Sequence, residues 1–213
     1  MGLAVTAFLA SHRLTNQARF RAWAETRLGG RLGFTIAYSA LSLALLAWII
    51  LAYRQAPVVL LWEQSPWMRW VPPIAMVPAC LLLAIGMSTA NPFSIGPGAR
   101  GFDPACPGVL RLTRHPVLWA AALWAAAHMA PNGDVAALMI FAPMLALALI
   151  GPRLLDAKRR RTLAGWPELA RLTGKIHPRL ISEIGWWRPL AGLALYAFLL
   201  WAHPIVIGAS PLP

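Results

Sequence analysis

The chain has 213 residues, of which 59% are hydrophobic and 12% are charged, and its net charge is +12. A soluble domain of this size carries about twice that share of charged residues, so the composition excludes an ordinary soluble domain and favours an all-α, polytopic transmembrane helical bundle. An excess of Lys and Arg is typical of cytoplasmic loops in membrane proteins. The hydrophobic composition implies a lipid bilayer as the partner. We expect no nucleic-acid binding, because basic and aromatic residues do not alternate as they do in a nucleic-acid-binding groove.

Apolar segments follow one another along the chain and predict about six membrane segments. The first, residues 2–11, is short, since about ten residues rise only ~15 Å as a helix, half of a ~30 Å bilayer core. It either continues through the polar residues after His12 or enters the membrane partway, and without a basic n-region it is expected to be a retained helix. The other segments are residues 32–53, 70–90, 117–130, 135–150 and 187–207.

The connections between these segments carry their own signals. Pro131-Asn132-Gly133-Asp134 predicts a tight turn that joins two segments as a helical hairpin, with Asp134 as the cap of the second helix. Residues 91–115 are rich in Pro and Gly, which predicts a structured loop without helix. Residues 153–188 include a run of four basic residues from Lys158 and predict a basic interfacial segment. We expect one transmembrane domain, residues 1–213, that includes this segment.

The distribution of Lys and Arg predicts the orientation. If the N-terminus lies outside, the cytoplasmic loops are residues 12–31, 91–116 and 153–188, and they hold 17 of the 19 Lys and Arg residues. The remaining two are Arg54 and Arg69. The asymmetry favours six crossings with both termini outside, as expected for a multi-pass protein of a bacterial inner membrane.

Histidines in apolar segments are the main candidates for chemistry, because ionisable groups are costly there. His12 and His115 are expected at the cytoplasmic depth, and His128 and His203 at the outer depth, whereas His177 is expected to be a solvated loop residue. His115 and His128 are separated by ~20 Å along a helix axis, so one metal centre cannot use both. The pairs at matching depth are therefore His12 with His115 and His128 with His203.

Two imidazoles from different helices are a suitable ligand set for a b-type haem. Arg111 and Arg114 precede His115 on the water side and are candidates to pair with haem propionates; the alternative is that they are ordinary cytoplasmic charges. Pro116 suits the first helical position, which makes His115 the N-cap with a ring free to point into the bundle mouth. The alternative to capping is that Asp134 or Asn132 fixes the tautomer of His128 by a hydrogen bond.

Several stretches together resemble the NnrU family of bacterial membrane proteins. The resemblance covers nearly the whole chain, and its most specific block is LRLTRHPVLWAAALWAAAHMAPNGD. The other matching stretches are Ser11-His12, residues 32–42, 56–62 and 91–92, Gly151, Asp156, residues 158–160, Ala202-His203-Pro204 and residues 208–211.

The family is associated with nitrite and nitric oxide reduction, and the 15-cis-ζ-carotene isomerase of plants and cyanobacteria is similar to it. That enzyme holds haem b through histidine, so the resemblance implies His12 and His115 as axial ligands. The resulting expectation is a haem b protein, with His12, His115, His128, His203, Arg111 and Arg114 as cofactor-binding candidates, that acts in nitrogen-oxide metabolism or in redox-linked isomerisation of an apolar polyene such as a carotenoid. On this assignment His115→Ala removes haem and His177→Ala does not.

Two alternative functions remain open, a methyltransferase and a non-enzymatic accessory protein. The Arg114-His115-Pro116 helix start also resembles membrane lipid and isoprenoid methyltransferases, whose S-adenosylmethionine would lie at the 91–115 loop and the basic segment. A non-enzymatic accessory protein for a reductase is the third hypothesis.

Overall fold

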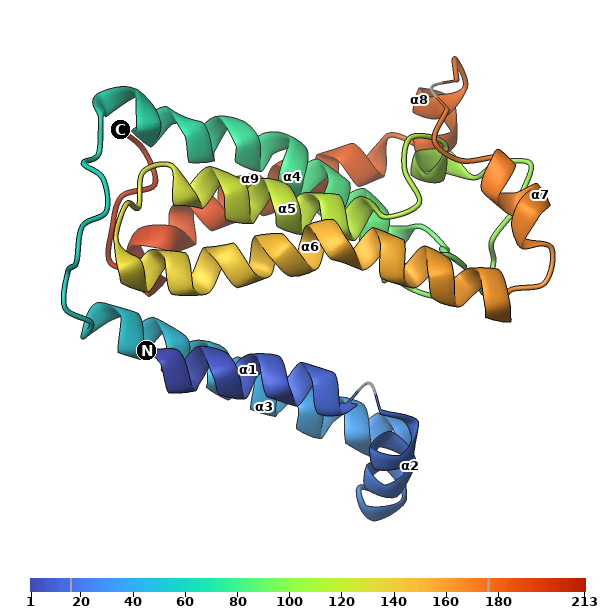
Figure 1. Cartoon of the computed structure of the whole chain (residues 1–213). Helices are drawn as coiled ribbons and strands as arrows, with labels where there is room; N and C mark the ends of the chain where they lie inside the picture. The colour runs from blue at the N-terminus through green and yellow to red at the C-terminus, as the bar shows by residue number, and fades with distance from the viewer. Residues whose placement is uncertain (16, 176) are drawn as a thin grey trace. The chain divides into compact units, whose positions relative to one another are not determined.

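The computed structural model describes residues 1–15, 17–175 and 177–213, and the two positions left out fall in the expected loops 12–31 and 153–188. The described residues form helices and no strand, which confirms the all-α prediction (Figure 1). The α-helices are α1 (Gly2–Thr15), α2 (Ala18–Arg27), α3 (Arg31–Arg54), α4 (Val71–Ser88), α5 (Pro116–Met129), α6 (Val135–Thr162), α7 (Trp166–Arg171), α8 (Leu180–Ile184) and α9 (Trp187–Val206), and the 3-10 helices are η1 (Pro66–Trp70) and η2 (Gly108–Arg111).

Four stretches of the described chain are long and apolar enough to cross a membrane. They are Arg31–Arg54, Pro66–Ser88, Val135–Thr162 and Trp187–Val206, and the shorter Pro116–Met129 is also apolar. The 24 residues of α3 rise ~36 Å, more than a bilayer core of ~30 Å, whereas the 14 residues of α5 rise only ~21 Å. The lengths and composition confirm a polytopic helical membrane protein.

The first helix continues past His12 to Thr15, which is one of the two outcomes that the sequence left open. Helix boundaries differ from the sequence expectation in other places. The expected loop 12–31 contains α2, and the 91–115 loop contains the short helix η2. Helix α6 runs through Pro152 into the basic run and ends at Thr162, since Lys and Arg are good helix formers and stabilise a helix C-terminus.

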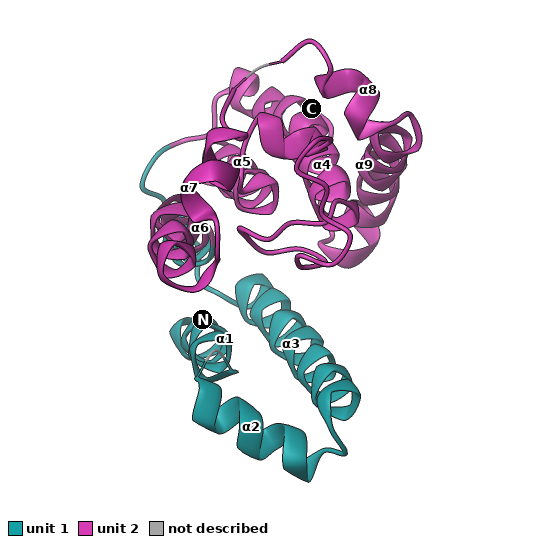
Figure 2. Cartoon of the chain, turned by 90° about the vertical axis from the view of Figure 1, so that its right-hand side faces the viewer, with its two compact units in different colours: residues 1–62, 134–140 teal, residues 63–133, 141–213 magenta. Residues whose placement is uncertain are grey.

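The chain divides into two compact units (Figure 2). Unit 1 comprises residues 1–62 and 134–140, and its core contains Ala4, Val5 and Ile49. Asp134 caps the start of α6 in this unit, because its Oδ1 accepts a hydrogen bond from Ala137 N at 2.9 Å, as the turn sequence predicts. Tyr53 donates its hydroxyl to the same carboxylate at 3.4 Å.

Unit 2 comprises residues 63–133 and 141–213, and in it α4 packs against both α5 and α9 (Figure 2). Glycines allow the close approach of these helices. A methyl group on Gly86 would lie 2.8 Å from the Pro116 side chain, and one on Gly192 would lie 2.9 Å from Leu81 Cα. In a membrane the hydrophobic effect does not drive helices together, because lipid is as apolar as they are. Small residues stabilise helix pairs there by allowing close van der Waals packing.

We expect Gly192→Val to destabilise unit 2 by about 1–3 kcal/mol, because the added methyl groups meet the main chain of α4 and that helix must shift. Ala194→Val, at an exposed position of the same helix, should stay within about 0.5 kcal/mol of the parent. Thermal unfolding of the purified variants in detergent measures both effects. Equal melting temperatures for the two variants would contradict the close contact.

Candidate functional site

The loop between α4 and α5 is folded around its own apolar core. Phe93 and Leu110 are both 0% exposed, and they pack with Val109 and Trp166. The rings of Phe93 and Trp166 meet edge to face, with centroids 5.6 Å apart. This packing fixes the loop against α7 and holds the polar side chains beside it.

Asn91 connects the two ends of this loop. Its Oδ1 accepts hydrogen bonds from Phe93 N at 2.8 Å and Ser94 N at 3.1 Å, and its Nδ2 donates to Arg114 O at 3.0 Å. The side chain is almost fully buried, so these bonds satisfy a polar group that would otherwise be costly. Asn91 thereby sets the position of Ser94 relative to the residue before His115.

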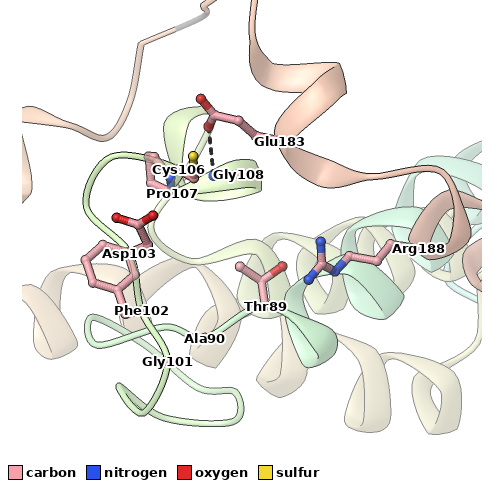
Figure 3. Close-up of a pocket in the computed structure, with 10 residues that line it drawn as sticks. All are labelled: Thr89, Ala90, Gly101, Phe102, Asp103, Cys106, Pro107, Gly108, Glu183 and Arg188. Atoms are coloured by element: carbon pink, nitrogen blue, oxygen red, sulfur yellow. Dashed lines mark hydrogen bonds between the residues drawn. The ribbon is translucent and has the colours of Figure 1, made fainter.

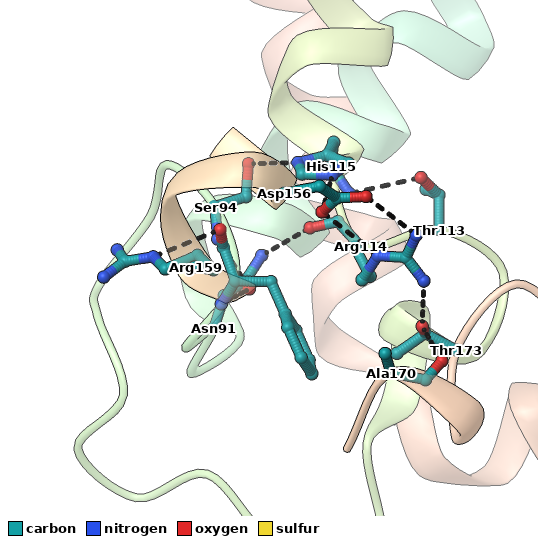
Figure 4. Close-up of polar contacts among 10 residues, drawn as sticks. Asn91, Ser94, Thr113, Arg114, His115, Asp156, Arg159, Ala170 and Thr173 are labelled. Carbon is teal, nitrogen blue, oxygen red and sulfur yellow. Dashed lines mark hydrogen bonds and ion pairs between the residues drawn. The ribbon is translucent and has the colours of Figure 1, made fainter. Parts of the chain in front are cut away.

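His115 is the N-cap residue of α5 and Pro116 is the first helical residue, as the sequence predicts. Its ring, however, does not point freely into the bundle mouth: the residue is 4% exposed and both ring nitrogens are hydrogen-bonded (Figure 4). Nε2 lies 3.0 Å from Asp156 Oδ1 and Nδ1 lies 2.9 Å from Ser94 Oγ. Since a carboxylate only accepts, Nε2 donates to Asp156, and the Nδ1 of the neutral ring accepts from the serine hydroxyl.

Arg114 completes the cluster by binding the same carboxylate. Its Nη2 is 2.9 Å from Asp156 Oδ2 and its Nε is 3.3 Å from Oδ1, while Nη1 donates to Thr173 Oγ1 at 2.7 Å (Figure 4). The guanidinium also lies over the Trp166 ring, 5.7 Å from its centroid. Charge-assisted bonds of this kind join α5, α6 and the segment after α7 at one point.

Burial lowers the pKa of His115, and the nearby Arg114 charge lowers it further, whereas Asp156 acts in the opposite direction. In the unfolded chain a histidine titrates near pH ~6.5. As the pH falls below that value, the unfolded chain takes up a proton that the folded ring resists, so the free energy of unfolding decreases with falling pH.

We therefore expect the melting temperature of the wild-type protein to fall as the pH is lowered from neutral through the normal histidine range, and the fall to be smaller for His115→Gln. The comparison of slopes matters, because the substitution also removes hydrogen bonds and lowers stability at every pH. Thermal unfolding across that range in detergent provides the measurement. Parallel pH profiles for the two proteins would contradict the burial of a neutral His115.

Arg111 belongs to a second ion pair. Its Nε and Nη2 each lie 2.8 Å from an oxygen of Glu183, and Gly108 N donates to Glu183 Oε2 at 3.1 Å. The hydrogen bond from Arg111 holds the pKa of Glu183 below its usual value. Arg111 and Arg114, the two arginines expected to bind propionates, thus each have a carboxylate partner within the chain.

The other histidines occupy three different environments. His12 lies in unit 1, with Nδ1 2.9 Å from Phe8 O and its ring edge-on to Tyr38. His128 and His203 lie near the C-terminal ends of α5 and α9 in unit 2, with Nδ1 at 2.8 Å from Trp124 O and from Ala209 O, respectively. Asn132 donates to the main-chain oxygen of His128 at 2.7 Å and not to its ring.

His177 is exposed, as the sequence predicts for a solvated loop residue. Its Nδ1 accepts a hydrogen bond from Arg179 N at 3.2 Å, and this local contact is of the kind that a surface turn contains.

Sequence reasoning did not single out Ser94, Asn91 or Thr173 as site residues. Asp156 was named only among the residues that carry the family resemblance, and its place in the basic segment 153–188 gave no further signal. The partners of His115 are 21 and 41 residues away in the sequence. Sequence spacing therefore does not reveal them.

One comparison with known proteins identifies a family. The family model described as NnrU protein matches residues 1–211 of the chain. No curated protein and no solved structure matches the chain.

Proposed function

Since the chain belongs to the NnrU family, we propose that it is a haem b protein of a bacterial inner membrane in which His128 and His203 would hold the haem iron. The proposed role is redox-linked isomerisation of an apolar polyene or a step in nitrogen-oxide metabolism. When bound, the haem would supply a one-electron redox centre whose ferrous form binds nitric oxide. The chain's own residues would hold it, orient it and keep water away.

The hydrogen bonds of the two imidazoles are the observation that supports this ligand pair. In each ring Nδ1 lies 2.8 Å from a main-chain carbonyl oxygen, which only accepts, so Nδ1 carries the proton. The neutral ring then has its lone pair on Nε2, the usual arrangement of a metal-bound histidine with a fixed second nitrogen.

The packing of unit 2 supports the same pair. Helices α5 and α9 both pack on α4 and run in the same direction, so their C-terminal ends lie at one end of the unit (Figure 1). The His128 ring stacks on Phe141, with centroids 5.3 Å apart, and so has an apolar neighbour. Arg69, in the 3-10 helix η1 that precedes α4, donates to Leu212 O near the C-terminus and is a cation suited to a propionate at this end.

His115 fits a haem ligand less well. An iron at Nε2 would displace Asp156, and an iron at Nδ1 would displace Ser94, because both nitrogens are in use. Loss of either bond leaves a buried polar group without its partner. His12, the other ligand that the family resemblance implies, does have its Nδ1 on a main-chain carbonyl.

The methyltransferase alternative has less support. The cavity at the 91–115 loop has a volume of about 100 Å³, and sites for cofactors usually enclose roughly 300–1,000 Å³. It is suited to a small group, and not to the whole of S-adenosylmethionine.

A reduced-minus-oxidised absorption spectrum of the purified wild-type protein tests the proposal. We expect the α-band of a b-type haem in the protein solubilised with detergent. The band should disappear when the haem is removed and return when haem is added back. A protein that stays colourless after reconstitution contradicts the proposal and favours the accessory role.

A further inference from the structure

A small cavity lies at one end of unit 2, where the 91–115 loop meets α8 and the start of α9 (Figure 3). It has a volume of about 100 Å³, enough for a compact polar group or a few waters. Its lining includes Arg188, Asp103, Phe102 and Glu183. The cavity is separate from the proposed ligands His128 and His203, which lie at the opposite ends of α5 and α9.

Arg188 brings a positive charge to this cavity without a counter-ion. Its Nη1 donates to Ile184 O at 2.6 Å and its Nη2 reaches Ser88 O only at 3.5 Å. Nε is buried and has no hydrogen-bond partner, and within the described residues no carboxylate oxygen lies within 4.0 Å of the guanidinium. The guanidinium lies over the Trp187 ring, 5.0 Å from its centroid, and this contact stabilises the charge in part. An anion in the cavity would neutralise it.

Asp103 brings an unpaired negative charge to the same cavity. One carboxylate oxygen accepts a hydrogen bond from Ala105 N at 2.8 Å, and the residue forms no ion pair with any described cation. Figure 3 shows Asp103 and Arg188 on opposite sides of the cavity, with Phe102 next to the carboxylate. Glu183 does not compete for a ligand cation, because Arg111 already pairs with both of its oxygens.

We propose that this cavity binds a zwitterion of the phosphoethanolamine type, with its phosphate on Arg188 and its ammonium on Asp103. Each end of such a ligand neutralises one of the two unpaired charges. The aromatic face of Phe102 adds a favourable surface for the ammonium. Because Asp103 is exposed to solvent, its pairing would favour a zwitterion without being required, whereas a purely cationic ligand would leave Arg188 without a counter-ion.

The surroundings favour a lipid headgroup as the source of this zwitterion. Trp186 and Trp187 flank Arg188 at the start of the apolar helix α9, and they are 79% and 47% exposed. Tryptophans at the end of a membrane-spanning helix are typical of the headgroup region. The cavity accommodates the headgroup only, so the acyl chains of phosphatidylethanolamine would remain in the bilayer.

Calorimetric titration of the full-length protein in detergent with short-chain lipids tests the site. The probes are the dihexanoyl forms of phosphatidylethanolamine, phosphatidylcholine and phosphatidate, together with free O-phosphoethanolamine. We expect phosphatidylethanolamine to bind most tightly, because only its ammonium donates N–H bonds to Asp103 alongside the phosphate contact. Binding of free O-phosphoethanolamine with the same affinity would identify a soluble zwitterion, and not a lipid, as the source.

Two substitutions separate the two ends of the ligand. Arg188→Gln should weaken phosphatidylethanolamine and phosphatidate at least about tenfold, as expected for losing hydrogen bonds to a charged group. Asp103→Asn, at an exposed position, should lower the affinity for phosphatidylethanolamine. Its affinity for phosphatidate should be unchanged or higher. Arg171→Gln, an exposed arginine outside the cavity, is the matched control. Equal affinities of all three lipids, or wild-type binding by both cavity variants, would overturn the proposal.

Discussion

The His128→Ala and His203→Ala variants are each expected to purify with haem content at least about tenfold below wild type, since even outer partners of a metal ligand change affinity by ~10–100-fold. Removal of either imidazole leaves the iron with one protein ligand. His177→Ala should keep the wild-type content, because that side chain is exposed and belongs to a surface turn. Haem per protein, measured from absorbance after extraction, gives the comparison.

The same series includes the ligand pair that the family resemblance implies. His12→Ala and His115→Gln are expected to retain haem if His128 and His203 are the ligands. Glutamine at position 115 keeps hydrogen-bonding capacity toward Ser94 and Asp156, so it disturbs the cluster less than alanine does. If these two variants lose haem while His128→Ala and His203→Ala keep it, the iron is bound by His12 and His115.

The Asp156→Ala variant is expected to lose about 2–4 kcal/mol of stability, the largest structural effect in the chain. Asp156 accepts from Arg114 and His115, and its removal leaves a guanidinium and a buried imidazole N–H without their acceptor. The Arg114 and Asp156 side chains are 27% and 17% exposed, so water reaches the guanidinium in part, and the main cost is the buried His115 N–H left without an acceptor. The loss should appear in chemical unfolding of the purified protein in mixed micelles.

Two further variants make this test specific. Asp156→Asn keeps one carbonyl oxygen as an acceptor, so it should lose less stability than alanine. Glu168→Ala removes an exposed acid on α7 and should change stability by less than about 0.5 kcal/mol. If Asp156→Ala is no less stable than Glu168→Ala, the cluster does not hold α5, α6 and the segment after α7 together.

The sequence predicted those features that depend on neighbouring residues. Pro116 at the first helical position and Asp134 at the turn are local signals, and both helix starts are found where they were expected. Long apolar runs predicted the spans for the same reason, since length and hydropathy decide which helices cross a membrane. The extension of α1 past His12 to Thr15 is one of the two alternatives that the sequence left open.

The environment of His115 was not predictable from local pattern. Its ring is fixed by Ser94 from the loop and Asp156 from α6, and only tertiary packing brings these segments together. The loop itself was expected to be irregular from its Pro and Gly residues, yet Phe93 and Leu110 are completely buried in it. An irregular segment has no periodic pattern from which burial could be inferred.

Electron paramagnetic resonance of the ferric protein tests the central proposal most directly, because it reports the ligands of the iron. We expect wild-type protein to give the low-spin signal of iron held by two imidazoles, and His203→Ala to lose that signal. A bis-imidazole signal that persists when His128 and His203 are both replaced would contradict the proposed pair.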